Sequence, residues 1–189
     1  MRKILSLLLC LLSLASCNKD ASQQTNKNYK VGDLYSVGGV MGIVYKVDNT
    51  GKSGMIVSLH EPETLLAWSS ELTTTNANSQ TSGSLNMSTI ISLSDWQTKY
   101  PAFAWCQSLD KNWYLPSIEE LKELSQVVNS NNFTKAIRKY EATPFATNAR
   151  YLSSTEMDQF WVYLLDISTN TESANYKQYT YHIRAIRAF

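Results

Sequence analysis

Two short motifs in the first third of the chain resemble known chemical signatures. Gly51-Lys52-Ser53 matches the end of a phosphate-binding loop, but that motif needs a glycine five positions earlier, where the chain has Lys46. His60-Glu61 begins like a zinc-protease motif, but the second histidine belongs at position 64, which is Thr64. Pro62 would also break the helix that has to present both ligands. Neither motif therefore predicts catalysis or phosphate binding.

Other metal and catalytic chemistry finds little support in the residue types. The chain has only two histidines, His60 and His182, which are too few for a conventional zinc site. Composition leaves a Ser-His-Asp site open, but no nucleophile-elbow motif supports one. We therefore expect no catalytic residues, no metal, no cofactor and no enzymatic activity.

The N-terminus predicts where in the cell the protein is located. Arg2 and Lys3 precede an apolar run, residues 4–14, and the chain continues with Ala15-Ser16-Cys17. This run is too short to span a membrane, which takes roughly 20 residues. A basic start, a short apolar core and a small-residue exit predict a signal peptide over 1–16, with Cys17 diacylated as the mature N-terminus of a lipoprotein. The alternative is an ordinary cleaved signal followed by a coincidental cysteine.

Composition bounds the rest of the chain. Residues 17–28 are polar and predict a flexible tether, which leaves 29–189 for a single domain. The net charge is +1, so we expect no nucleic-acid binding, and contact with a membrane only through the lipid. The chain is rich in aromatic residues, with eleven Tyr, five Trp and five Phe, which suits a β-rich extracytoplasmic domain. Without Cys10 and Cys17 only Cys106 remains, so no intramolecular disulfide is expected.

The first half of the domain predicts a hairpin, a loop and then helices. Strands over 40–47 and 55–59 flank the turn residues 48–51, and a long polar loop covers 69–86. Ser94 is expected to cap a helix that Pro101 interrupts, giving a broken helix or two pieces between 87 and 109.

The second half predicts one strong helix followed by strands. Ser117 and Glu120 form a capping box before a helix with an apolar face, and a shorter helix is expected over 132–140. Strands are expected over 151–154, 160–167, 174–179 and 181–189. The predicted fold class is α+β: an antiparallel or mixed β-sheet with two to three helices inserted between an N-terminal hairpin and a C-terminal β-meander.

Three motifs in this region carry a resemblance. They are Trp113-Tyr114-Leu115-Pro116-Ser117 with Glu119-Glu120-Leu121, then Tyr151-Leu152-Ser153-Ser154-Thr155-Glu156, and finally Ile183-Arg184-Ala185-Ile186-Arg187. Together they resemble the C-terminal domain of Legionella collagen-like protein, which also occurs in many Bacteroides-type lipoproteins. The resemblance covers about residues 80–189 and implies a C-type-lectin-like fold, whose members are mostly unassigned.

The signature residues also suggest structural roles. Trp113 and Tyr114 are expected to pack against the sheet. Arg184 and Arg187 are expected to pair with acidic residues such as Glu119 or Glu120.

The candidate ligand residues lie in two segments. Trp68 precedes the polar 69–86 loop, and an aromatic face beside amide and hydroxyl groups is typical of sugar recognition. The resemblance implies that ligand loops lie near 148–158, which adds Asn148, Arg150, Glu156 and Asp158. The alternative for each segment is an ordinary solvated loop.

Calcium-dependent sugar binding is not expected. The Glu61-Pro62-Glu63 tripeptide ends in Glu rather than Asn or Asp, and it follows the first hairpin instead of lying in a late loop.

These features predict a lipid-anchored protein of the cell envelope. It would act as a non-enzymatic binding or adhesion module for glycan, matrix polymer or a protein partner. The alternative function is a structural or accessory subunit of an envelope assembly.

Overall fold

The structure is a computed structural model that describes residues 27–189. The predicted signal peptide, Cys17 and nearly all of the predicted tether lie outside the described residues. Within residues 27–189 no helix is both long enough and apolar enough to cross a membrane.

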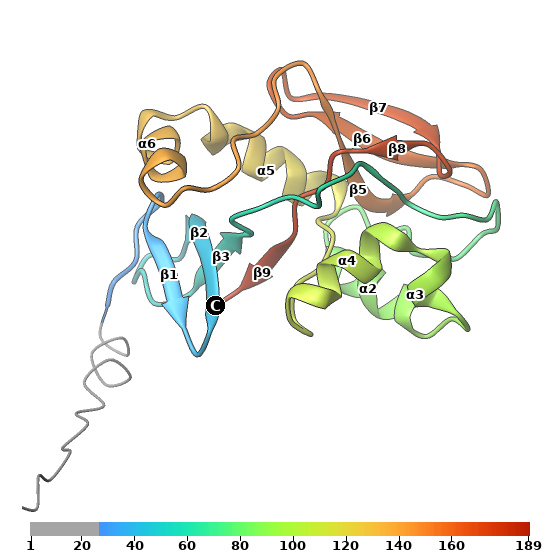
Figure 1. Ribbon diagram of the computed structural model, residues 1–189, viewed down its shortest axis with the longest axis horizontal. Helices are drawn as coiled ribbons and strands as arrows, with labels where there is room; N and C mark the ends of the chain where they lie inside the picture. Colours follow the sequence, from blue (N-terminus) through green and yellow to red (C-terminus); the bar gives the residue numbers. More distant parts are fainter. Residues whose placement is uncertain (1–26) are drawn as a thin grey trace, which may run out of the picture.

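The first sheet has four antiparallel strands in the order β1-β2-β3-β9 (Figure 1). They are β1 (Leu34–Val37), β2 (Val40–Val47), β3 (Gly54–Val57) and β9 (Ile186–Ala188). The pairing of β2 with β3 confirms the predicted hairpin. Asp48 shapes its turn by accepting hydrogen bonds from Thr50 and Ser53.

Five helices follow within the described residues, rather than two to three. They are α2 (Gly83–Ile91), α3 (Trp96–Lys99), α4 (Pro101–Leu109), α5 (Ile118–Val128) and α6 (Asn131–Lys139). The predicted break at Pro101 is confirmed, because α3 ends at Lys99 and α4 begins with the proline. The capping box of Ser117 and Glu120 at the start of α5 is confirmed as well.

Two helix starts differ from the prediction. Ser94 does not cap α3, because the residue in the N-cap position is Asp95, whose φ of 56° turns the chain into the helix. The polar loop ends at Ser82, whose side chain accepts a hydrogen bond from the Leu85 N–H and so starts α2 inside the predicted loop. The expected 69–86 loop is therefore a 69–82 segment followed by a helix.

The second sheet comprises β5 (Arg150–Glu156), β6 (Trp161–Asp166) and β7 (Thr171–Tyr176), all antiparallel. A two-stranded ladder of β4 (Leu66–Ala67) and β8 (Thr180–Tyr181) adjoins this region. The predicted strand over 174–179 is displaced, since β7 begins three residues earlier, at Thr171, and ends at Tyr176.

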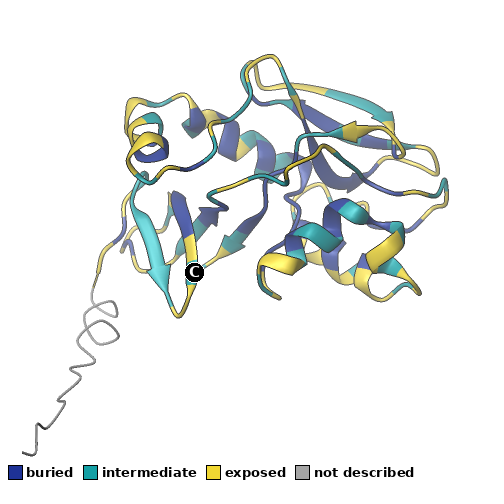
Figure 2. Cartoon of the chain, viewed as in Figure 1, coloured by how far each residue is buried: buried dark blue, intermediate teal, exposed yellow. Residues whose placement is uncertain are grey.

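The core lies where α5 packs between the two sheets, in contact with β2, β5 and β6 (Figure 1). Buried residues line the surfaces that face this helix, while exposed residues collect on the outer strands and loop tips (Figure 2). Trp113 and Tyr114 are buried, and Tyr114 exchanges two backbone hydrogen bonds with Ile186 of β9. The fold is therefore α+β with antiparallel sheets, as predicted.

The two signature arginines have other partners than those expected. Arg187 pairs with Asp110 at 2.5 Å, and the fully buried Arg184 lies 3.6 Å from Glu61. The expected pairing with Glu119 or Glu120 is wrong, because those side chains bond Lys122 and the N-terminus of α5 instead.

Candidate functional site

A group of neighbouring aromatic side chains, two of them exposed, lies at one end of the three-stranded sheet. Trp161 at the start of β6 stacks on Tyr176 at the end of β7, with ring centroids 4.9 Å apart and an interplanar angle of 32°. Tyr176 in turn meets Tyr179 edge-on at 5.7 Å. We call Trp161, Tyr176 and Tyr179 the aromatic surface.

Strand periodicity explains why these rings face outward. Successive side chains of a strand point to opposite faces. Val162 and Leu164 of β6 are fully buried, so Trp161 belongs to the outer face, and its cross-strand partner Tyr176 lies beside it. Tyr176 is 39% exposed and Tyr179 is 55% exposed. The half-buried Trp161 ring and the two exposed tyrosines together present apolar ring surface with polar edges.

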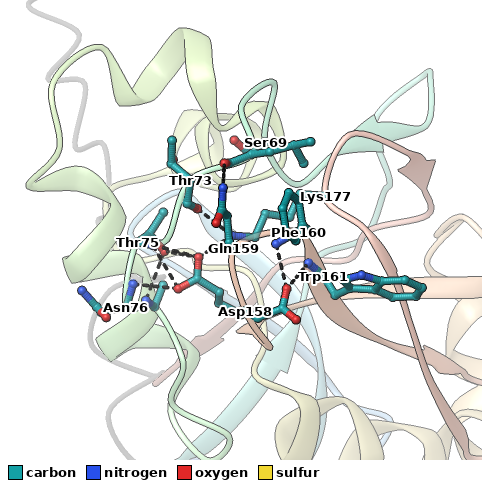
Figure 3. Close-up of polar contacts among 12 residues, drawn as sticks. Ser69, Thr73, Thr75, Asn76, Asp158, Gln159, Phe160, Trp161 and Lys177 are labelled. Carbon is teal, nitrogen blue, oxygen red and sulfur yellow. Dashed lines mark hydrogen bonds and ion pairs between the residues drawn. The ribbon is translucent and has the colours of Figure 1, made fainter.

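Asp158 orders the turn that leads to the aromatic surface. Its Oδ1 accepts hydrogen bonds from the backbone N–H groups of Phe160 at 2.7 Å and Trp161 at 2.9 Å. In Figure 3 the Trp161 ring points away from the polar groups around Thr75 and Asn76. Asp158 is exposed, and its observed contacts assign it to the support of the turn; a ligand contact stays a prediction.

Glu156 is buried beneath this turn and is fully engaged. Its carboxylate accepts the N–H groups of Thr75 at 2.8 Å and Asn76 at 2.7 Å, and it pairs with the Lys177 ammonium. The Lys177 ammonium also donates to the carbonyl of Thr73 at 2.7 Å. The predicted ligand role of Glu156 is thus overturned, since the side chain is buried and its oxygens bond the 69–82 segment to the sheet.

Burial and pairing act in opposite directions on Lys177. Its side chain has no exposed surface, so desolvation lowers the pKa of the ammonium, and the neighbouring Glu156 carboxylate opposes that shift. The Glu156–Lys177 pair therefore has a structural role, since it holds the 69–82 segment against the sheet, and we call it the clamp.

Trp68 is also part of the interior. Its ring is fully buried, with edge-to-face contacts to Tyr100 at 5.6 Å and Phe103 at 5.1 Å, and the Lys177 ammonium lies 4.9 Å from its centroid. The prediction of a sugar-stacking face at Trp68 is overturned, because residues flanking and within α4 cover the ring.

Asn148 and Arg150 lie apart from the aromatic surface. Both are exposed, and Arg150 is opposite Asp166, the last residue of β6, whereas Trp161 is the first. The structure therefore does not bring these two residues together with Asp158, and their ligand role stays a prediction.

Sequence reasoning missed the aromatic surface. The signal was present: the alternation of Trp161, Val162, Tyr163 and Leu164 marks one outer aromatic face on a strand. What the sequence does not contain is the register that places Tyr176 opposite Trp161.

A second polar cluster surrounds Glu61. The Glu61 carboxylate accepts a hydrogen bond from the Tyr151 hydroxyl at 2.6 Å and contacts His182 Nδ1 at 2.8 Å. Burial is the largest cause that raises the pKa of Tyr151, and it lowers that of Arg184. Within residues 27–189 His182 forms no hydrogen bond to a serine, threonine or cysteine, so the geometry does not assemble a nucleophile with this histidine.

The described part of the chain shows little other reactive chemistry. Residues 27–189 contain no group of three or more His, Cys, Asp or Glu side chains placed to hold a metal ion. The Cys106 thiol is buried, and desolvation raises its pKa, which disfavours the nucleophilic thiolate.

Comparisons with known proteins show a structural likeness but no matching family. No protein-family model matches the sequence, and no curated protein matches it. The fold is similar to that of a fimbrial protein from Bacteroides ovatus ATCC 8483, with a TM-score of 0.66 and 18% sequence identity. The match covers 85% of this chain and 49% of that one, so the chain spans about half the length of the solved structure. At this identity the likeness shows the fold alone.

Proposed function

We propose that this chain is a non-enzymatic adhesion module of the bacterial cell envelope that binds glycan or matrix polymer through the aromatic surface. The observation that carries the proposal is the stacked pair of Trp161 and Tyr176, extended by the exposed Tyr179. Rings of this kind pack on the apolar faces of sugars while their polar edges reach hydroxyl groups.

The support beneath the rings suits a binding surface. Asp158 fixes the turn and the Glu156–Lys177 pair fixes the neighbouring loop, so a ligand would meet a platform already ordered. Preorganisation of this kind reduces the entropy that binding costs.

The fimbrial protein of similar fold supports a place in the envelope. The proposal includes anchoring through a lipid on Cys17, which would hold the domain near the membrane. The same likeness favours a second candidate function, in which the chain is an accessory subunit of an envelope assembly and the aromatic surface contacts a protein.

Binding to purified polysaccharides tests the proposal. The full-length protein would be run in affinity electrophoresis through gels containing cellulose, mannan, galactan or chitin derivatives. We expect retardation by at least one polymer, weakened about tenfold or more by Trp161→Ala and by Tyr179→Ala, which corresponds to a loss of about 1.4 kcal/mol. Leu85→Ala is the control, because Leu85 is 58% exposed on α2 and away from the rings.

Two outcomes would count against this site. Retention that Trp161→Ala leaves unchanged and Arg150→Ala abolishes would move the site to the other end of β6. A complete lack of retention, combined with cross-linking of Tyr179 variants to an envelope protein in cells, would favour the accessory-subunit function.

A further inference from the structure

A pocket separate from the aromatic surface lies between the helices and the edge of the first sheet. It has a volume of about 370 Å³ and is bounded by α2, by the segment that follows α4 and by β9. Met87 and Ile91 of α2 form an apolar wall, and Asn112, Lys111 and Arg187 supply polar groups. The volume falls in the range of about 300–1,000 Å³ typical of ligand pockets.

The floor of this pocket includes an open strand edge. β9 is the last strand of its sheet, on the side that faces α2 and α4 (Figure 1). Gly54 and Phe189 exchange both backbone hydrogen bonds, so by antiparallel alternation Ala188 directs its N–H and C=O away from β3. Ile186, two residues earlier, points the same way and is satisfied by Tyr114.

Ala188 has no such partner. Among residues 27–189 nothing pairs with its N–H or C=O, and the residue is exposed and lines the pocket. The pocket thus presents one free donor and one free acceptor in the geometry that receives another extended backbone.

The charge of the pocket indicates what such a backbone should carry. Arg187 is paired with Asp110 at 2.5 Å, whereas Lys111 is exposed and forms no ion pair among the described residues. The Lys111 ammonium is therefore available to an acidic group of a ligand in the pocket.

We propose that this pocket binds the carboxyl-terminal end of an extended peptide. The peptide backbone pairs with the free N–H and C=O of Ala188, and the terminal carboxylate meets the Lys111 ammonium. The last side chain is apolar and packs against Met87 and Ile91. This site is independent of the aromatic surface, none of whose residues lines the pocket.

A titration with short peptides tests this proposal. The ¹⁵N-labelled full-length protein would be titrated with acetyl-Ala-Gly-Leu bearing a free carboxylate and with the same peptide as its C-terminal amide. We expect amide shifts centred on Ala188 and Asn112, and binding of the acid at least tenfold tighter than that of the amide. Lys111→Glu should weaken the acid at least tenfold, whereas Lys52→Glu, the same charge change on an exposed lysine of the β2–β3 turn, should leave it unchanged.

The backbone part of the proposal has its own variant. Ala188→Pro removes the free N–H without removing a bond to β3, and proline is tolerated on edge strands. We expect this variant to lose the peptide while its thermal midpoint stays near that of the parent; if it fails to fold, the amide shifts and Lys111→Glu still decide the matter.

Three results would overturn the proposal. They are equal binding of the acid and the amide, binding that Lys111→Glu leaves intact, and peptide-induced shifts that avoid Ala188. Binding of free D-glucuronate in the absence of any peptide binding would also overturn it and would assign the pocket to an acidic sugar.

Discussion

Individual buried charges hold this molecule's loops in place. Glu156 and Lys177 are 2% and 0% exposed, respectively, at their side chains, and both bond backbone groups of the 69–82 segment as well as each other. A buried ion pair of this kind adds little net stability over a well-packed apolar pair, but breaking it leaves one charge in a low-dielectric interior. The pair therefore determines where the segment lies, and removing one partner alone should destabilise the fold.

The variant Glu156→Gln tests how far the fold depends on this buried ion pair. It leaves the buried Lys177 ammonium without a counter-charge, so we expect the free energy of unfolding to fall by about 3–5 kcal/mol in urea denaturation. The double variant Glu156→Gln/Lys177→Met removes the stranded charge and should recover more than half of the loss. A fall under about 1 kcal/mol, the range of an exposed ion pair, would contradict the clamp.

Among the helices and strands, the sequence predicts best those whose stabilising contacts are close together in the chain. The capping box of Ser117 and Glu120 lies within four consecutive residues, and the β2–β3 hairpin closes through its own turn. The start of α2 has a local cap in Ser82, but its remaining support comes from residues that are distant in sequence. The Gly83 N–H donates to Glu120, and the Asn86 side chain bonds Ser154 at 2.9 Å.

In the candidate site too, contacts between residues that are distant in sequence could not be predicted. The resemblance implies a ligand loop that includes Asp158, but the role of Asp158 as the acceptor for the turn depends on the folded hairpin. The polar stretch after Trp68 predicts an exposed ring, whereas the rings that bury it, Tyr100 and Phe103, come some thirty residues later in the chain.

The β2–β3 hairpin should respond to acid through Asp48. Hydrogen bonds from Thr50 and Ser53 lower the pKa of this carboxyl from 3.8 to about 2. The folded form is the stronger acid, so the stabilisation is present above pH 3.8 and is lost as the pH falls toward 2. We expect the thermal midpoint of the parent to exceed that of Asp48→Asn at pH 5 and the difference to shrink through this window, as followed by circular dichroism. An NMR midpoint for Asp48 at or above 3.8 would show that the turn does not favour the charged form.

For the whole molecule, the order of strands and helices predicted the α+β class, but not how the two sheets are joined. The polar cluster around Glu61 connects the two sheets. Glu61 follows β3, Tyr151 belongs to β5, and His182 and Arg184 lie on the segment that leads to β9. Arg184 also donates to the carbonyls of Ser58, Leu59 and Thr143, and its guanidinium lies 4.3 Å from the Phe145 ring centroid. No periodicity or motif in the sequence pairs these positions, so the sequence does not predict Glu61 as the acidic partner of Arg184.

Glu61 should therefore matter to the stability of both sheets together. Glu61→Gln keeps the side-chain shape but removes the carboxylate nearest to the fully buried Arg184, so we expect a loss of about 3–5 kcal/mol in the free energy of unfolding. Glu63→Gln is the matched control two residues away, and its exposed side chain predicts a change of under about 0.5 kcal/mol. Urea denaturation followed by tryptophan fluorescence and by far-UV circular dichroism should shift to the same lower midpoint in both signals. Equal stability of the two variants would mean that the backbone carbonyls alone hold Arg184 and that the Glu61 cluster does not join the sheets.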